Sequence, residues 1–284
     1  MTDRALKPAF AAAALLLAAC AAGLSLPALA AAPPPVPLLP YADLADLADH
    51  APTVVRARIR SVAVVEPARA IGLRPGQARL YVEAQTTALL SGPSLTGDSL
   101  RYLADVPLDA KGKPPKLTKR EVLIFARTVP ARPGELQLVA PDAQVLWSPA
   151  NEERLRAILT ELLAPGAPGR VTRVSEAIYV PGTLAGEGET QMFLDTADHE
   201  PTSITVTHRA GSEPHWNVSF SEVVNSDGTP PARDTLPWYR LACFLPRQLD
   251  PAVNVSAASE DKVQAEADYA YVLTQLGACP RMRS

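Results

Sequence analysis

The stretch Asp195-Thr-Ala-Asp198-His199-Glu200 contains three carboxylates and one imidazole within six positions. These are ligand types for Ca²⁺ or Zn²⁺, provided that they converge on one point. An Asp-rich stretch is also how an ordinary hairpin turn is built. We favour the turn and predict no metal, no other cofactor and no catalytic residue. A hydrolytic metal site at Asp195, Asp198, His199 and Glu200 is the alternative.

Two histidines, His208 and His215, flank a short loop and raise the question of a shared metal. If the apolar side chains of the two strands lie on the same face of the sheet, Val206 must pair with Val218. The same register places His208 opposite Trp216. The two histidines then point to opposite faces of the sheet, because side chains alternate along a strand. We therefore expect no shared metal, and we expect His208 to stack on Trp216.

Other catalytic patterns are absent from the sequence. No serine lies in a G-x-S-x-G turn. The glycines of GTLAGEGE (182–189) lack the spacing and the following Lys of a phosphate-binding loop, and no dinucleotide fingerprint is found. These absences favour a protein that acts through its surface.

The stretch KGKPPKLTKR (111–120) holds five of the 27 basic residues. One interpretation is a patch for anions or membrane head groups. The other is a solvated loop. The net charge of the whole chain is −3, which argues against nucleic acid as the main partner, since phosphate binding needs a basic face.

The first residues predict export. Met1–Lys7 carries two positive charges, and residues 8–32 carry none, as in a secretory signal peptide. Ala28-Leu29-Ala30 is a cleavage site of the A-x-A type, so that the mature chain would start at Ala31.

A second processing site competes with the first. Leu17-Ala-Ala-Cys20 resembles a bacterial lipobox, which would attach lipid to Cys20. We favour cleavage between Ala30 and Ala31, which gives a periplasmic or extracellular protein. A lipid-anchored envelope protein is the alternative, and an uncleaved anchor also remains open.

Either cleavage leaves two cysteines available for a disulfide, Cys243 and Cys279. In an oxidising compartment an even pair predicts one disulfide. Two buried free thiols are the alternative.

Period-two alternation and turn residues predict strands, and a 3.6-residue apolar period predicts helices. A first helix is expected at 41–48, and Ser148 is expected to cap a helix that ends near 165. Asp234 and Ser259 are expected to cap the last two helices, 234–246 and 259–277. The expected strands are 53–67, 79–92, 99–106, 121–129, 134–139, 170–180, 189–196, 202–210 and 215–224.

These elements predict a β-rich α+β chain. Residues 1–30 form the signal peptide and 31–40 a proline-rich lead. Residues 41–165 form a five-stranded OB-like barrel with a helix. Residues 166–284 form a four-stranded antiparallel meander packed with two C-terminal helices, which the disulfide joins. A single domain over 41–284 also remains open.

The pattern LADHAPTVVRARIRSV, LYVEAQTTALLSG and REVLIFARTV resembles exported OB-like domains of the netrin/TIMP type, over roughly residues 41–147. The second half, with DTLPWYRLACFLP and YAYVLTQLGACP, is similar to a group of uncharacterised exported proteins of Alphaproteobacteria. These resemblances imply an exported β-rich fold and bring no site residues.

The sequence therefore predicts a non-catalytic exported envelope protein that acts by surface interaction. Its expected partner is an envelope protein or a small ligand. Membrane contact is expected only through the signal peptide or a lipid anchor. The alternative is a periplasmic metal-dependent hydrolase that uses the carboxylates of 195–200.

Overall fold

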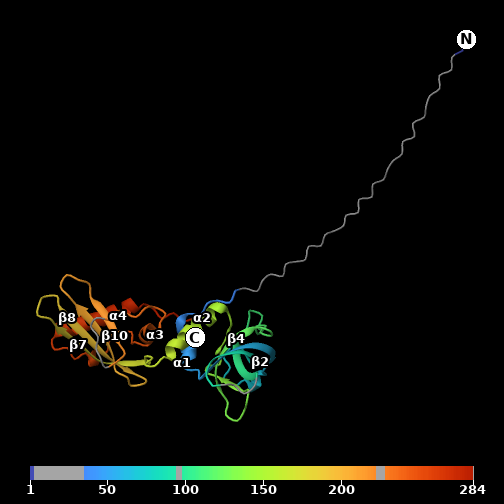
Figure 1. Ribbon diagram of the computed structural model, residues 1–284, viewed down its shortest axis with the longest axis horizontal. Coiled ribbons are helices and arrows are strands. Elements are labelled where there is room, and N and C mark those ends of the chain that lie inside the picture. The colour runs from blue at the N-terminus through green and yellow to red at the C-terminus, as the bar shows by residue number, and fades with distance from the viewer. Residues whose placement is uncertain (3–34, 94–97, 222–227, 284) are drawn as a thin grey trace. The chain divides into compact units, whose positions relative to one another are not determined.

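The computed structural model describes residues 1–2, 35–93, 98–221 and 228–283 (Figure 1). The expected signal peptide, Cys20 and the Ala30–Ala31 cleavage site lie outside the described residues. Val36–Ser284 forms one compact unit that contains two sheets and four α-helices. Among the described helices, none has the length and apolar content that a membrane span requires.

The first sheet has six strands in the order β3-β2-β1-β4-β5, with β6 paired to β4, and all these pairs are antiparallel. The five strands expected for the first half are confirmed. The sequence did not predict β6, because three residues are too few to show a two-residue alternation. The strands are β1 (Thr53–Val64), β2 (Gln77–Ser91), β3 (Ser99–Pro107), β4 (Glu121–Thr128), β5 (Leu136–Leu138) and β6 (Gln144–Leu146).

Alternation along β1 gives the first sheet its two faces. Val55, Ala57 and Ile59 are at most 1% exposed and pack in one apolar core with side chains of β2, β3 and β4. Arg58 and Arg60, on either side of Ile59, point to the other face and are exposed. Because β1 pairs with both β2 and β4, it is a central strand of the sheet. Its arginines on the face opposite the core are therefore held in place by two neighbouring strands.

The strand ladders of this sheet do not close into a barrel among the described residues. β3 meets β5 at a single parallel bridge, between Arg101 and Glu135. The amide of Asp105 also donates to the carbonyl of Pro141 at 2.7 Å. The fold shown is therefore α+β with an open six-stranded sheet and a second sheet.

The second sheet is the expected antiparallel meander, in the order β10-β9-β8-β7. Its strands are β7 (Val171–Pro181), β8 (Gly188–Thr196), β9 (Thr202–His208) and β10 (His215–Ser219). The expected register of the last pair is wrong by two residues, since Trp216 lies opposite Val206. Alternation of apolar side chains fixes which face a residue occupies, and a shift of two residues preserves that face.

The helices are α1 (Tyr41–Asp49), α2 (Pro149–Leu162), α3 (Leu236–Ala242) and α4 (Ser259–Leu276), with short 3₁₀ turns η1 (Pro67–Arg69) and η2 (Pro251–Val253). Ser148 caps α2 as expected, accepting from the amide of Asn151 at 3.2 Å. Two expected caps are wrong. Thr235 rather than Asp234 caps α3, and Ser259 is already the first residue of α4.

The second core cluster brings together residues from both halves of the sequence. It contains residues of α1, α2, α3, α4, both sheets and the tryptophan of β10. Trp238, Tyr239 and Tyr269 are its largest fully buried side chains. The division of Val36–Ser284 into two domains at residue 165 remains a prediction.

Cys243 and Cys279 form the expected disulfide, with their Cα atoms 5.2 Å apart. Cys243 is the C-terminal cap of α3, and Cys279 follows the end of α4. The bond therefore joins the ends of the last two helices, as expected.

Candidate functional site

The residues of the proposed metal site do not converge. Asp195 forms an ion pair with Arg173, with 2.6 Å between carboxylate oxygen and Nε. Asp198 and Glu200 line a hollow against the loop 164–169. His199 is exposed and has a φ of 62°, within the turn that the favoured interpretation of this stretch expected. Across the described ranges, no three His, Cys, Asp or Glu side chains lie close enough together to hold a metal ion.

The histidines occupy opposite faces of the second sheet. His215 is exposed, and its Nε2 lies 2.7 Å from the carbonyl oxygen of Gly228. His208 lies on the other face and contacts Asp268 of α4. The expected stacking on Trp216 is wrong, because the aromatic neighbour of His208 is Tyr179, edge-on with ring centroids 6.1 Å apart.

Asp268 is the centre of a buried polar cluster that the sequence did not predict. Only 2% of the residue is exposed. Its carboxylate lies 2.9 and 3.0 Å from Nε2 of His208, and it accepts hydrogen bonds from the hydroxyl of Thr190 and the amide of Gln264. These donors come from β8, β9 and α4 itself. The cluster therefore fixes α4 on the sheet.

The cluster at Asp268 has part of the geometry of a catalytic pair, since a buried carboxylate orients an imidazole. No third member of such a set is seen among the described residues. Each partner that the structure gives the carboxylate belongs to the packing of α4, and the Thr190 hydroxyl bonds to the carboxylate rather than to His208. The arrangement accounts for stability rather than for nucleophilic chemistry.

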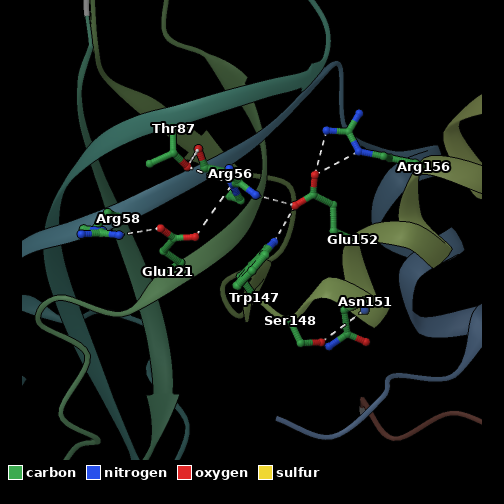
Figure 2. A network of polar contacts seen from close by, with 9 residues as sticks. All are labelled: Arg56, Arg58, Thr87, Glu121, Trp147, Ser148, Asn151, Glu152 and Arg156. Carbon is green, nitrogen blue, oxygen red and sulfur yellow. Dashed lines mark hydrogen bonds and ion pairs between the residues drawn. The ribbon is translucent and has the colours of Figure 1, made fainter. Parts of the chain in front are cut away.

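A second polar network surrounds Glu152, near the start of α2 (Figure 2). Its carboxylate accepts from Nε1 of Trp147 at 2.5 Å, from Nη1 of Arg56 at 3.0 Å and from Arg156 at 2.7 and 2.9 Å. Burial alone would raise the pKa of Glu152. The hydrogen bonds from Trp147 and Arg156 and the charge of Arg56 hold that pKa below its ordinary value.

Arg56 joins this network to the outer face of β1. Its guanidinium lies 5.2 Å from the centre of the Trp147 ring and donates to the hydroxyl of Thr87 at 3.1 Å. On the next strand Glu121 lies 2.9 Å from Arg58 (Figure 2). Both carboxylates of the network are thus occupied by arginines of the same protein. The network holds α2 against β1 and leaves more positive than negative charge on this face.

The loop between β3 and β4 continues this positive face. Its end is fixed to β1 by two backbone bonds, from the amide of Lys119 to the carbonyl of Ile59 at 2.8 Å and from the amide of Ile59 to the carbonyl of Arg120 at 2.9 Å. Ile59 is the residue between the exposed Arg58 and Arg60. The end of the loop, at Lys119 and Arg120, therefore lies beside the outer arginines of β1.

The loop is ordered by its own contacts. Asp109 Oδ1 accepts from the amides of Lys111 and Lys113, both at 2.8 Å. Leu117 is only 6% exposed and packs in the core of the first sheet. These two anchors leave the lysine side chains exposed. We call the following residues the basic surface: Arg58, Arg60, Lys111, Lys113, Lys116, Lys119 and Arg120.

Lysine use in the chain singles out this loop. Four of the six lysines of the sequence lie between positions 111 and 119, and the remaining two are Lys7 and Lys262. In the part of the chain that the structure describes, every ion pair uses an arginine or a histidine, so these four ammonium groups have no carboxylate partner.

The acidic groups of α1 are occupied by the C-terminal segment and by α3. Asp43 is 1% exposed and accepts from the amide of Met282 at 2.8 Å. Asp46 pairs with Arg281 at 2.7 Å, and Asp49 binds Arg240 through both carboxylate oxygens, at 2.7 and 2.8 Å. The three-residue spacing of these aspartates places them along one helix face, and they fix α1 to α3 and to the C-terminal segment.

Comparison with known protein families finds no family model that matches the chain, and comparison with curated proteins finds no similar sequence.

Proposed function

We propose that the chain is an exported, non-catalytic protein of the bacterial envelope that acts by binding an anionic partner through its basic surface. The observation that carries the proposal is a set of four lysines that have no carboxylate partner among the described residues, on an ordered loop whose end is bonded to β1 between Arg58 and Arg60. Such a field of one sign attracts a partner of the opposite sign.

Export is part of this proposal and rests on the N-terminal sequence. The disulfide between Cys243 and Cys279 supports it, because disulfides persist in oxidising compartments. The intact mass of the protein from its host tests the processing. We expect a chain that begins at Ala31, and a diacylglyceryl or triacylglyceryl mass on Cys20 would establish the lipid-anchored alternative.

We also propose that the first sheet is a variant of the OB-like barrel. The support is the strand order β3-β2-β1-β4-β5, in which β1 pairs with two neighbours, together with the parallel contact between β3 and β5 at Arg101 and Glu135. This fold does not by itself assign a ligand.

The proposed interaction is tested by chemical cross-linking in intact cells of the host. The test variant carries Gln at Lys111, Lys113, Lys116 and Lys119, and is called the four-glutamine variant. The charge-matched control carries Gln at four exposed basic residues outside the basic surface that form no ion pair: Arg127, Arg209, Arg247 and Lys262. Both variants lose four positive charges.

An amine-specific cross-linker would react less with the four-glutamine variant simply because four lysines are gone. The cross-linker must therefore react with carboxylates and serines as well as with amines. We expect wild type and the charge-matched control to give the same cross-linked species, and the four-glutamine variant to lose them. Identical cross-linking by all three forms would refute an envelope protein as the partner of the basic surface.

A further inference from the structure

We propose that the anionic partner of the basic surface is a phosphate-bearing lipid surface of the envelope. The inference rests on the proposed function and deepens it by naming the chemical class of the partner. The sequence left residues 111–120 open between an anion or head-group patch and a solvated loop, and the contacts of the loop now favour the patch.

The first argument is the type of cation. Elsewhere in the described chain, arginines make the specific ion pairs, often through two parallel bonds, as Arg240 does with Asp49. The loop uses lysine instead. An ammonium group is a strongly hydrated point charge on a flexible stem, whereas the guanidinium suits planar, bidentate recognition. Lysines therefore suit a diffuse layer of anions better than one precisely placed carboxylate.

The second argument is shape. The lysines project from an exposed loop whose centre is Pro114-Pro115, and the hollows near Asp198 and beside Tyr81 lie elsewhere on the molecule. A small ligand is normally bound in a concave site. A projecting row of cations instead fits an extended anionic surface, in which many head groups can each approach one ammonium.

The third argument is the balance of charge at the loop. Asp109 is the only carboxylate between positions 108 and 120, and it accepts hydrogen bonds from two backbone amides. Glu121 is held by Arg58. Glu83 of β2 is exposed beside Ser61, whose hydroxyl donates to it at 2.8 Å, and adds one opposing carboxylate. The loop nevertheless carries more positive than negative charge, although the net charge of the whole chain is −3.

The fourth argument is the number of cations. Four to eight Lys or Arg residues in one cluster are typical of binding to anionic lipids, and each contributes about a factor of five to partitioning. The basic surface has seven. The interaction falls off within a Debye length of about 8–10 Å, so it must weaken as salt rises.

The test uses the protein as its host processes it, mixed with two kinds of vesicle. One kind contains phosphatidylcholine with phosphatidylglycerol, and the other contains phosphatidylcholine alone. Lipid attached to Cys20, if present, contributes equally to both kinds and to all variants. The readout is the ratio of the two partition coefficients in a flotation assay.

We expect wild type and the charge-matched control to favour anionic vesicles, and this preference to fall between low and high salt. The four-glutamine variant should lose the preference by at least about 100-fold. A further variant with Arg at the same four positions should keep it, because the charge is conserved. Circular dichroism and the urea midpoint verify that each variant is folded.

Equal partitioning of wild type to the two kinds of vesicle, or an unchanged preference in the four-glutamine variant, would overturn the lipid inference. The cross-linking experiment then separates the two proposals. If the four-glutamine variant still loses a cross-linked envelope protein, the proposed function stands with an acidic protein as partner. If it loses none, both proposals fail.

Discussion

At the scale of single residues, Asp268 is a buried carboxylate with three side-chain hydrogen-bond partners. Its carboxylate has donors from Thr190, His208 and Gln264, and only 2% of the residue is exposed. Replacing it by alanine leaves the Thr190 hydroxyl and the imidazole without a buried acceptor. We expect Asp268→Ala to lower the free energy of unfolding by about 2–3 kcal/mol, measured by urea denaturation.

Glu266→Ala is the matched control, since Glu266 is exposed on the same helix. We expect a change of less than about 0.5 kcal/mol there. A similar small change for Asp268→Ala would show that the cluster does not fix α4 and would reopen a chemical role for His208.

A second prediction for a single residue concerns Glu152 and the pH dependence of stability. Its pKa is lower in the folded protein than in the unfolded chain, whose value lies near 4.5. Its ionised form therefore stabilises the fold above pH 4.5, and this contribution is lost as pH falls through the folded pKa. We expect wild type to be more stable than Glu152→Gln at pH 7, and the difference to shrink between about pH 5 and pH 3.

Urea midpoints at pH 7, 5, 4 and 3 measure this difference. Glu153→Gln is the control, because Glu153 is exposed on the same helix and has no ion pair in the described structure. A difference for Glu152→Gln that stays constant with pH would contradict the network shown in Figure 2.

Site prediction from the sequence succeeded for single residues and failed for clusters. The alternation of β9 and β10 placed the two histidines on opposite faces correctly. It could not pair His208 with Asp268, because the two lie 60 positions apart and no local period connects strand and helix. The sequence likewise did not predict the network at Glu152, because its partner Arg56 lies 96 positions away.

At the scale of elements, the disulfide and the C-terminal segment act together. Cys279 is bonded to the end of α3, and the residues after it bind α1, through Arg281 to Asp46 and through the Met282 amide to Asp43. The last residues of the chain are thereby held on its first helix. Removing the disulfide should weaken the contact between the C-terminal segment and α1. It should also raise the conformational entropy of the unfolded chain.

We expect Cys243→Ser with Cys279→Ser to cost about 3–4 kcal/mol of unfolding free energy, as closure of a loop of 36 residues predicts. Trypsin should also cleave the variant after Arg281 faster than wild type. Free thiols in denatured, unreduced wild type would contradict the disulfide, and unchanged cleavage after Arg281 would contradict its role in holding the segment.

Strands and helices were predicted well because most of them carry clear periods. β1 and β4 are unmistakable, and so is α2 with its Ser148 cap. The errors arise where several registers or caps satisfy the same pattern. Trp216 faces Val206 rather than His208 because a two-residue shift keeps every apolar side chain on its face. Thr235 replaces Asp234 because the neighbouring residue is an equally good cap.

At the scale of the whole molecule, the compact unit Val36–Ser284 is expected to unfold cooperatively. Its larger core cluster includes α1 and α2 from the first half and α3 and α4 from the second. We expect one calorimetric transition whose van't Hoff enthalpy equals the measured enthalpy. Two transitions that divide near residue 165 would instead show independent domains.

The proposed role of the basic surface is tested most directly by lysine reactivity in the native envelope. Intact envelopes and purified protein are treated briefly with an acetylating reagent, and each lysine is quantified by mass spectrometry. Lys262 is exposed on α4, outside the basic surface, and serves as the internal reference. We predict that Lys111, Lys113, Lys116 and Lys119 react several-fold more slowly in envelopes, while Lys262 does not change. Equal reactivity of all five lysines in both preparations would contradict the account.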